Sequence, residues 1–118
     1  MSMTIDRLRE LIGDELTLAL IEARAGTRLY VARERHAASV LADIVGVDAA
    51  AKIADEYGGE SWMVPIAREF RIEAYSRRGM PVPVIARRVG CHADWVFKIR
   101  RKLQMSRAQL DLFKSEAG

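Results

Sequence analysis

The sequence predicts a mostly α-helical protein, with two short β-strands in its N-terminal region and a three-helix unit containing a helix-turn-helix in its C-terminal part. Three observations support this fold class. Apolar residues recur at helical spacing along most of the 118 residues, and two short stretches rich in β-forming residues each follow a glycine. One C-terminal segment also has the residue spacing of a helix-turn-helix. We expect the two regions to meet between residues 65 and 66.

The N-terminal region begins with two predicted helices, over residues 4–12 and 15–25, each with apolar residues at helical spacing. Gly13 separates these helices, and Asp14 is a candidate N-cap of the second one. Residues 28–32 are too few for a stable helix and are rich in β-formers. We therefore expect a short strand there.

The same order of elements recurs 33 residues later along the chain. A helical face over residues 40–45 is interrupted by Gly46, and a second helix is expected over 49–57 with Asp48 as its candidate N-cap. Residues 61–65 again read as a short strand. This pattern predicts an internal repeat, in which the identical residues at the offset of 33 are Leu8 and Leu41, Gly13 and Gly46, Gly26 and Gly59, and Val31 and Val64.

Neither copy of this unit is large enough to bury its own apolar face. Two copies can do so if their strands pair as a two-stranded ribbon with the helices on one side. The ribbon can close within one chain, as a pseudo-dimer, or between two chains of a homodimer, and the sequence leaves both arrangements open. The candidate association residues in the two strands are Leu29, Tyr30, Val31, Trp62, Met63 and Val64.

Charge divides the chain in the same place. Residues 1–65 contain 7 basic and 11 acidic side chains, for a net charge of −4. Residues 66–118 contain 12 basic and 5 acidic side chains, for a net charge of +7. A concentrated positive field attracts phosphate, although a solvated basic face without a partner has the same composition.

The C-terminal region is helical throughout, and Pro81 and Pro83 suit the start of a helix that Gly90 ends. Ser106 is a candidate N-cap of the last helix. The predicted helices cover residues 66–77, 81–89, 93–102 and 107–113.

The segment from residue 81 to residue 100 has the spacing of a helix-turn-helix. Ala86 is the small residue at the helix crossing, and Gly90, four residues on, allows the positive φ of the turn. Val96 and Ile99 then pack back against the first helix. A plain helical hairpin uses alanine and glycine in a similar way, but the surrounding basic charge favours the helix-turn-helix.

The outward positions of the second helix are the candidate residues for reading base edges in the major groove of DNA. Lys98 and Arg101 can donate to guanine or to phosphate, and Phe97 can pack on a thymine methyl group. The full set is His92, Ala93, Asp94, Phe97, Lys98 and Arg101. The nearby basic residues are candidates for contacts with the phosphate backbone: Arg77, Arg78, Arg87, Arg88, Arg100 and Lys102.

Other function classes find little support in the sequence. The single cysteine, Cys91, and two distant histidines, His36 and His92, cannot form a tetrahedral zinc site. No glycine-rich phosphate loop or nucleophile–histidine pair stands out, so we expect neither an enzyme nor a cofactor. There is no apolar run long enough to span a bilayer and no signal-peptide pattern, so we expect a protein of the bacterial cytoplasm without membrane contact.

The segment from Gly46 to Leu103 resembles the Mor/C family of phage transcription activators. The resemblance consists of the helix ending in Tyr57-Gly58-Gly59, the strand ending in Val64-Pro65, and the helix-turn-helix VPVIARRVGCHADWVFKIRRKL. It implies a homodimer in which strands from two subunits pair into a ribbon. It also implies binding to an imperfect inverted repeat in double-stranded DNA beside a promoter, and recruitment of RNA polymerase.

Two features depart from that family pattern. The stretch from Pro65 to Gly79 is shorter than the family's usual connector, and this chain has two predicted strands where the family has one per subunit. Two other functions therefore stay open. One is a protein-interaction module that places its basic face on an acidic protein, and the other is an accessory factor in DNA packaging or recombination.

Overall fold

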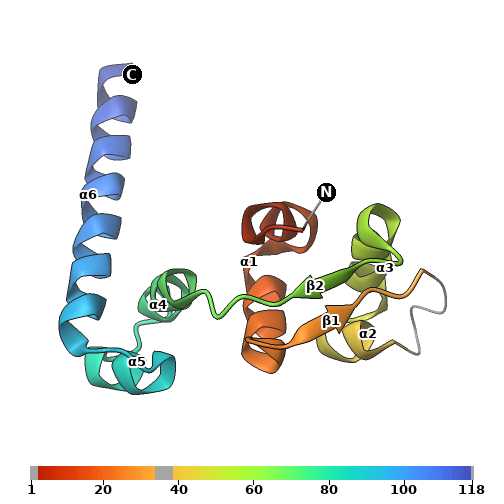
Figure 1. Ribbon diagram of the computed structural model, residues 1–118. Helices are drawn as coiled ribbons and strands as arrows, with labels where there is room; N and C mark the ends of the chain where they lie inside the picture. Colours follow the sequence, from red (N-terminus) through yellow and green to blue (C-terminus); the bar gives the residue numbers. More distant parts are fainter. Residues whose placement is uncertain (1–2, 34–38, 118) are drawn as a thin grey trace. The chain divides into compact units, whose positions relative to one another are not determined.

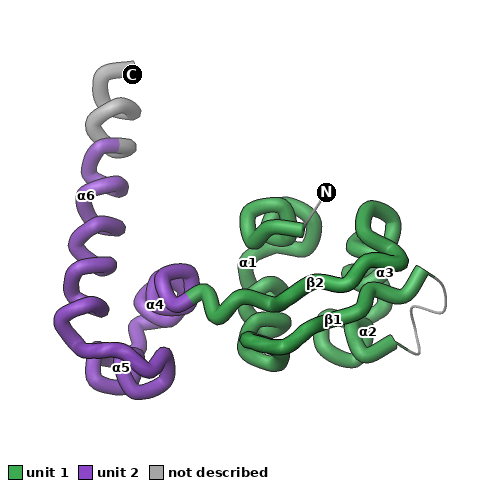
Figure 2. Tube along the Cα trace, in the orientation of Figure 1, with its two compact units in different colours: residues 1–67 green, residues 68–118 purple. Residues whose placement is uncertain are grey.

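The computed structural model describes residues 3–33 and 39–117, with side chains through residue 109. The predicted fold class is confirmed, because the described residues form helices with one two-stranded antiparallel sheet (Figure 1). The chain divides into two compact units, Met1–Ala67 and Arg68–Gly118, two residues beyond the predicted boundary (Figure 2). The elements are α1 (Ile5–Arg24), β1 (Arg28–Tyr30), α2 (Val40–Val45), α3 (Val47–Tyr57), β2 (Ser61–Met63), α4 (Arg68–Arg77), α5 (Val82–Val89) and α6 (Ala93–Ala117).

In the first unit, two glycines break the helices at equivalent points. Gly13 has φ 85° and ψ 168° inside α1, and Gly46 has φ 91° and ψ 162° between α2 and α3. The predicted caps at Asp14 and Asp48 are wrong, because the non-helical residues are the glycines themselves. Both aspartates lie instead in the first turn after a break, where a carboxylate favours the positive end of the helix dipole.

Replacing Gly46 with alanine is expected to destabilise the first unit by about 1–3 kcal/mol, because residues with a side chain rarely adopt this backbone conformation. A Cβ atom at Gly46 would have no heavy atom within 4 Å, so the cost comes from the backbone and not from a clash. Urea unfolding measures the loss. Gly13→Ala is the matched variant and should cost a similar amount, since Gly13 also has positive φ and a Cβ there would also meet nothing within 4 Å. A Gly46→Ala chain as stable as the original would contradict this account.

The two strands pair with each other within the chain, and their centre is the pair Leu29 and Trp62. These residues are equivalent in the two repeats, so the ribbon has an approximate two-fold axis at its middle. Both strands are two residues shorter than predicted, although hydrogen bonds at Val31 and Val64 continue beyond their ends. Leu29, Val31 and Val64 are buried, whereas Tyr30 and Met63 are exposed, which leaves one face of the ribbon open.

The helices of the first unit supply most of its core, and α1 and α2 are fixed at their starts by side-chain caps. The Thr4 hydroxyl accepts a hydrogen bond from the Arg7 backbone at 3.1 Å, and the Ser39 hydroxyl accepts one from Ala42 at 3.0 Å. Thr17 is fully buried, and its hydroxyl donates to the carbonyl of Gly13, four residues earlier, at 2.7 Å. The largest fully buried apolar side chains among the described residues of the first unit are Leu8, Leu18, Leu20, Ile21, Leu29, Val31, Ile53 and Val64.

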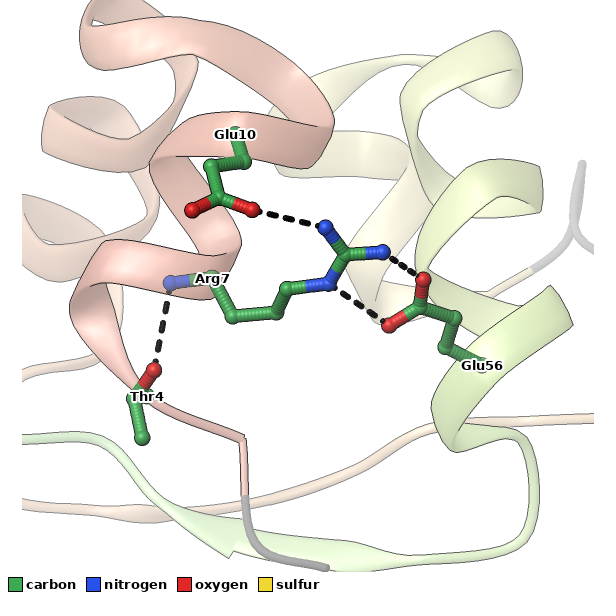
Figure 3. Close-up of polar contacts among 4 residues, drawn as sticks. All are labelled: Thr4, Arg7, Glu10 and Glu56. Carbon is green, nitrogen blue, oxygen red and sulfur yellow. Dashed lines mark hydrogen bonds and ion pairs between the residues drawn. The ribbon is translucent and has the colours of Figure 1, made fainter.

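An ion-pair cluster joins the helices of the two repeats (Figure 3). The guanidinium of Arg7 on α1 donates to both carboxylate oxygens of Glu56 on α3, with Nε at 2.9 Å from Oε2, and to Glu10 at 2.8 Å. The hydrogen bond from Arg7 lowers the pKa of the Glu56 carboxyl. The pair of Arg7 and Glu56 therefore connects α1 with α3.

In the second unit, α4 and α5 follow the prediction closely, but α6 does not end where expected. Residues 93–102 and 107–113 were predicted as two helices with Ser106 as the cap between them. The structure has one helix, α6, across both, and Ser106 lies inside it. No glycine or proline falls between Ala93 and Ala117, so nothing in the backbone stops the helix.

Candidate nucleic-acid interface

The turn between α5 and α6 has the backbone geometry of the predicted helix-turn-helix. Gly90 caps α5 in the left-handed conformation, with φ 76° and ψ 45°, and its N–H donates to the carbonyl of Ala86 at 2.9 Å. The N–H of Cys91 reaches the same carbonyl at 3.0 Å. A glycine is favoured here because a side chain opposes positive φ.

Apolar side chains from all three helices lock this turn in place. Ile85, Val89, Val96 and Ile99, the predicted contacts between α5 and α6, are at most 4% exposed. Tyr75 of α4 is fully buried with them. The apolar residues whose spacing predicted the motif therefore also form the core of the second unit.

Two arginines on α4 secure the end of α5, a role that no pattern in the sequence predicted. Arg71 Nη2 donates to the carbonyl of Arg88 at 3.0 Å, and Arg68 Nε donates to the carbonyl of Val89 at 3.4 Å. These are among the last carbonyls of a helix, which lack partners within it and lie at the negative end of its dipole.

The predicted reading face of α6 is exposed. Asp94, Phe97, Lys98 and Arg101 all reach the surface, and the Phe97 side chain is 51% exposed. Ala93 is half-buried. Because Val96 and Ile99 between them are buried, the two faces of this helix are clearly separated, and the outward one carries two basic side chains one turn apart.

His92 lies at the start of α6 and contacts the helix itself. Its Nδ1 accepts a hydrogen bond from the backbone N–H of Asp94 at 3.2 Å. This bond satisfies one of the free N–H groups in the first turn. The same Nδ1 lies 3.4 Å from a carboxylate oxygen of Asp94.

Trp95 belongs to this surface but was missing from the predicted set. Its side chain is 40% exposed, and the Lys98 ammonium lies 5.6 Å from the centre of its ring. This separation fits a cation–π contact, which restrains the lysine. Helical spacing from Val96 could have identified Trp95 as a flanking position.

Arg100 and Lys102 were predicted to face the flanking phosphates, and the structure gives both another role. The guanidinium of Arg100 turns inward and donates to the Ser76 hydroxyl at 3.1 Å and to the carbonyl of Met80. The Lys102 ammonium lies 3.2 Å from a carboxylate oxygen of Glu69 on α4. Arg100 therefore fixes α6 to the end of α4, and Lys102 is already paired with an acid.

Replacing Arg100 with alanine is expected to destabilise the second unit by about 1.5–3 kcal/mol, because hydrogen bonds to charged groups contribute that much. Arg101→Ala is the matched control on the exposed face, where substitutions usually stay within about 0.5 kcal/mol. Urea unfolding followed by circular dichroism compares the two. Equal stability of both variants would show that the contacts to Ser76 and Met80 contribute nothing.

The remaining predicted backbone contacts lie on α4, α5 and the turn between them. Arg77, Arg78, Arg87 and Arg88 are all exposed. The Arg88 guanidinium carbon is 5.1 Å from the centre of the Tyr75 ring, so this arginine also covers the core. A substitution of Arg87 therefore tests a phosphate contact made by α5 with less effect on the core than a substitution of Arg88.

The comparisons with protein-family models, curated proteins and solved structures give no match to this chain. The resemblance to the Mor/C family therefore stays a prediction. None of the described helices is both long and apolar enough to cross a membrane. His36, one of the two histidines, lies outside the described residues.

Proposed function

We propose that this chain is a sequence-specific DNA-binding protein that regulates transcription and reads double-stranded DNA through α5 and α6. The observation that carries this proposal is the conformation of the turn, with Gly90 in the left-handed region and Ala86, Val96 and Ile99 buried around it. An α-helix held in this way fits the major groove of B-form DNA.

The side chains on the outward face support the same function. Lys98 and Arg101 are donors suited to guanine N7 and O6, and Asp94 can accept from cytosine N4. Exposed arginines on α5 suit the phosphates that this helix crosses in such complexes. Recruitment of RNA polymerase, which would make the protein an activator, is proposed from the family resemblance.

Replacing Lys98 with alanine is expected to weaken binding to the preferred site by about 1–3 kcal/mol, with a smaller loss on random DNA, because a base contact is removed. Arg87→Ala is expected to weaken preferred and random DNA by similar factors, because a phosphate contact carries no sequence information. Fluorescence anisotropy with labelled duplexes measures both variants.

Circular dichroism checks that both variants are folded. A Lys98→Ala chain that loses affinity equally for all DNA, or loses none, would contradict the proposed orientation of α6. The preferred site comes from selection of duplexes from a random pool. If no sequence were enriched, the basic face would be assigned to an acidic protein partner instead.

A further inference from the structure

The ribbon is closed within one chain by hydrogen bonds that obey its two-fold symmetry. Four backbone hydrogen bonds flank the central strand pair, and they form two matched sets, each related by the repeat offset. The first set is Gly26 N–H to the Val64 carbonyl at 2.8 Å and Gly59 N–H to the Val31 carbonyl at 2.7 Å. The second set is Val31 N–H to the Glu60 carbonyl and Val64 N–H to the Thr27 carbonyl, both at 2.9 Å.

The apolar side of the ribbon is also used within the chain. Leu29 is 1% exposed, and Val31 and Val64 are fully buried. Three of the six residues that the sequence offered for association between chains therefore have no surface left for a partner. A second copy could replace these contacts only by opening the ribbon.

The two halves of this symmetric unit lead to different elements. After β2 the chain continues into α4 and the DNA-binding unit, whereas after the equivalent strand β1 it continues into α2. Within the described part of the chain, one ribbon with two-fold symmetry is thus joined to one helix-turn-helix. In a homodimer with the same ribbon there would be two.

We infer that one chain of this protein reads one asymmetric half-site, in place of the inverted repeat that the family resemblance implies. This inference rests on the proposed DNA-binding function. A half-site here is the stretch of duplex that a single recognition helix can contact within one major groove.

The first test uses duplexes that carry the sequence selected from a random pool, either as one copy or as two inverted copies. We expect one chain to bind each copy. Inserting five base pairs between the two copies rotates one relative to the other by about half a helical turn, and we expect the affinity per copy to change by less than about twofold. A homodimer with two linked helix-turn-helix units would lose much more affinity on this insertion. Two chains bound together, with a strong dependence on spacing, would overturn the inference.

The second test does not involve DNA. Tyr30 and Ser61 are exposed and face each other in register across the ribbon. Directly opposed residues in antiparallel strands have Cα atoms about 4.5–5.5 Å apart, within the range of about 4.4–6.8 Å that a disulfide requires. The full chain with Tyr30→Cys and Ser61→Cys, and with Cys91→Ser to remove the native thiol, should therefore form a disulfide on mild oxidation.

We expect the oxidised protein to run as a monomer on a non-reducing gel at all protein concentrations. The control with Tyr30→Cys and Cys91→Ser alone should form no internal crosslink. A covalent dimer of the double-cysteine chain would show that the strands pair between chains, which would overturn the inference and leave DNA binding intact. Failure to enrich any DNA sequence would overturn the proposed function and the half-site inference with it, whichever disulfide the double-cysteine chain forms.

Discussion

Raising the salt concentration from about 50 to about 200 mM is expected to weaken DNA binding by roughly 10³-fold, if about six phosphates are contacted. The physical reason is counterion release: each neutralised phosphate frees a condensed cation, and added salt opposes that release. The second unit has the charge for this, since its 12 basic and 5 acidic residues give a net charge of +7. The first unit, at −4, would add no attraction.

Anisotropy titrations at several salt concentrations give the slope of log affinity against log salt, which counts the phosphate contacts. Arg87→Ala should reduce that slope by about one contact. Arg100→Ala is the comparison variant. In the original chain the Arg100 guanidinium is bonded to Ser76 and Met80, so its removal should leave the slope unchanged as long as the variant is folded. Affinity that did not depend on salt would contradict a phosphate-contacting surface.

The parts of the fold that were predictable from the sequence depend on local rules. A glycine that takes positive φ breaks or ends a helix wherever it stands, and Gly13, Gly46 and Gly90 all do so. The burial of Val96 and Ile99 follows from helical spacing once the turn is located. For the same reason, the exposed positions of Lys98 and Arg101 were correctly predicted.

Other features depend on contacts that no local pattern encodes. The inward turn of Arg100 requires the Met80 carbonyl, in the connection between α4 and α5, to lie within its reach, which spacing along α6 cannot reveal. The contact between Arg7 and Glu56 joins residues 49 positions apart. The cap at Ser106 failed because a serine favours a cap only where the helix actually starts, and good helix-forming residues precede it.

Replacing Ile99 with alanine is expected to destabilise the second unit by about 2–5 kcal/mol, because it empties a fully buried position. The Ile99 side chain is 1% exposed, and its helix, α6, contacts both α4 and α5. The same variant should lose DNA binding. The first unit has its own core, so we expect its stability to be unchanged.

The two tryptophans of the chain allow each unit to be followed separately, since Trp62 lies in the first unit and Trp95 in the second. In a Trp95→Phe background, urea unfolding monitored by Trp62 should give the same midpoint with and without Ile99→Ala. In a Trp62→Phe background, the midpoint reported by Trp95 should fall. Phe97→Ala is the matched control: Phe97 is 51% exposed, two residues from Ile99 on the outward face, and its loss should cost less than about 0.5 kcal/mol. A common shift of both tryptophan signals in the Ile99→Ala chain would show that the two units unfold as one, against the division at residue 67.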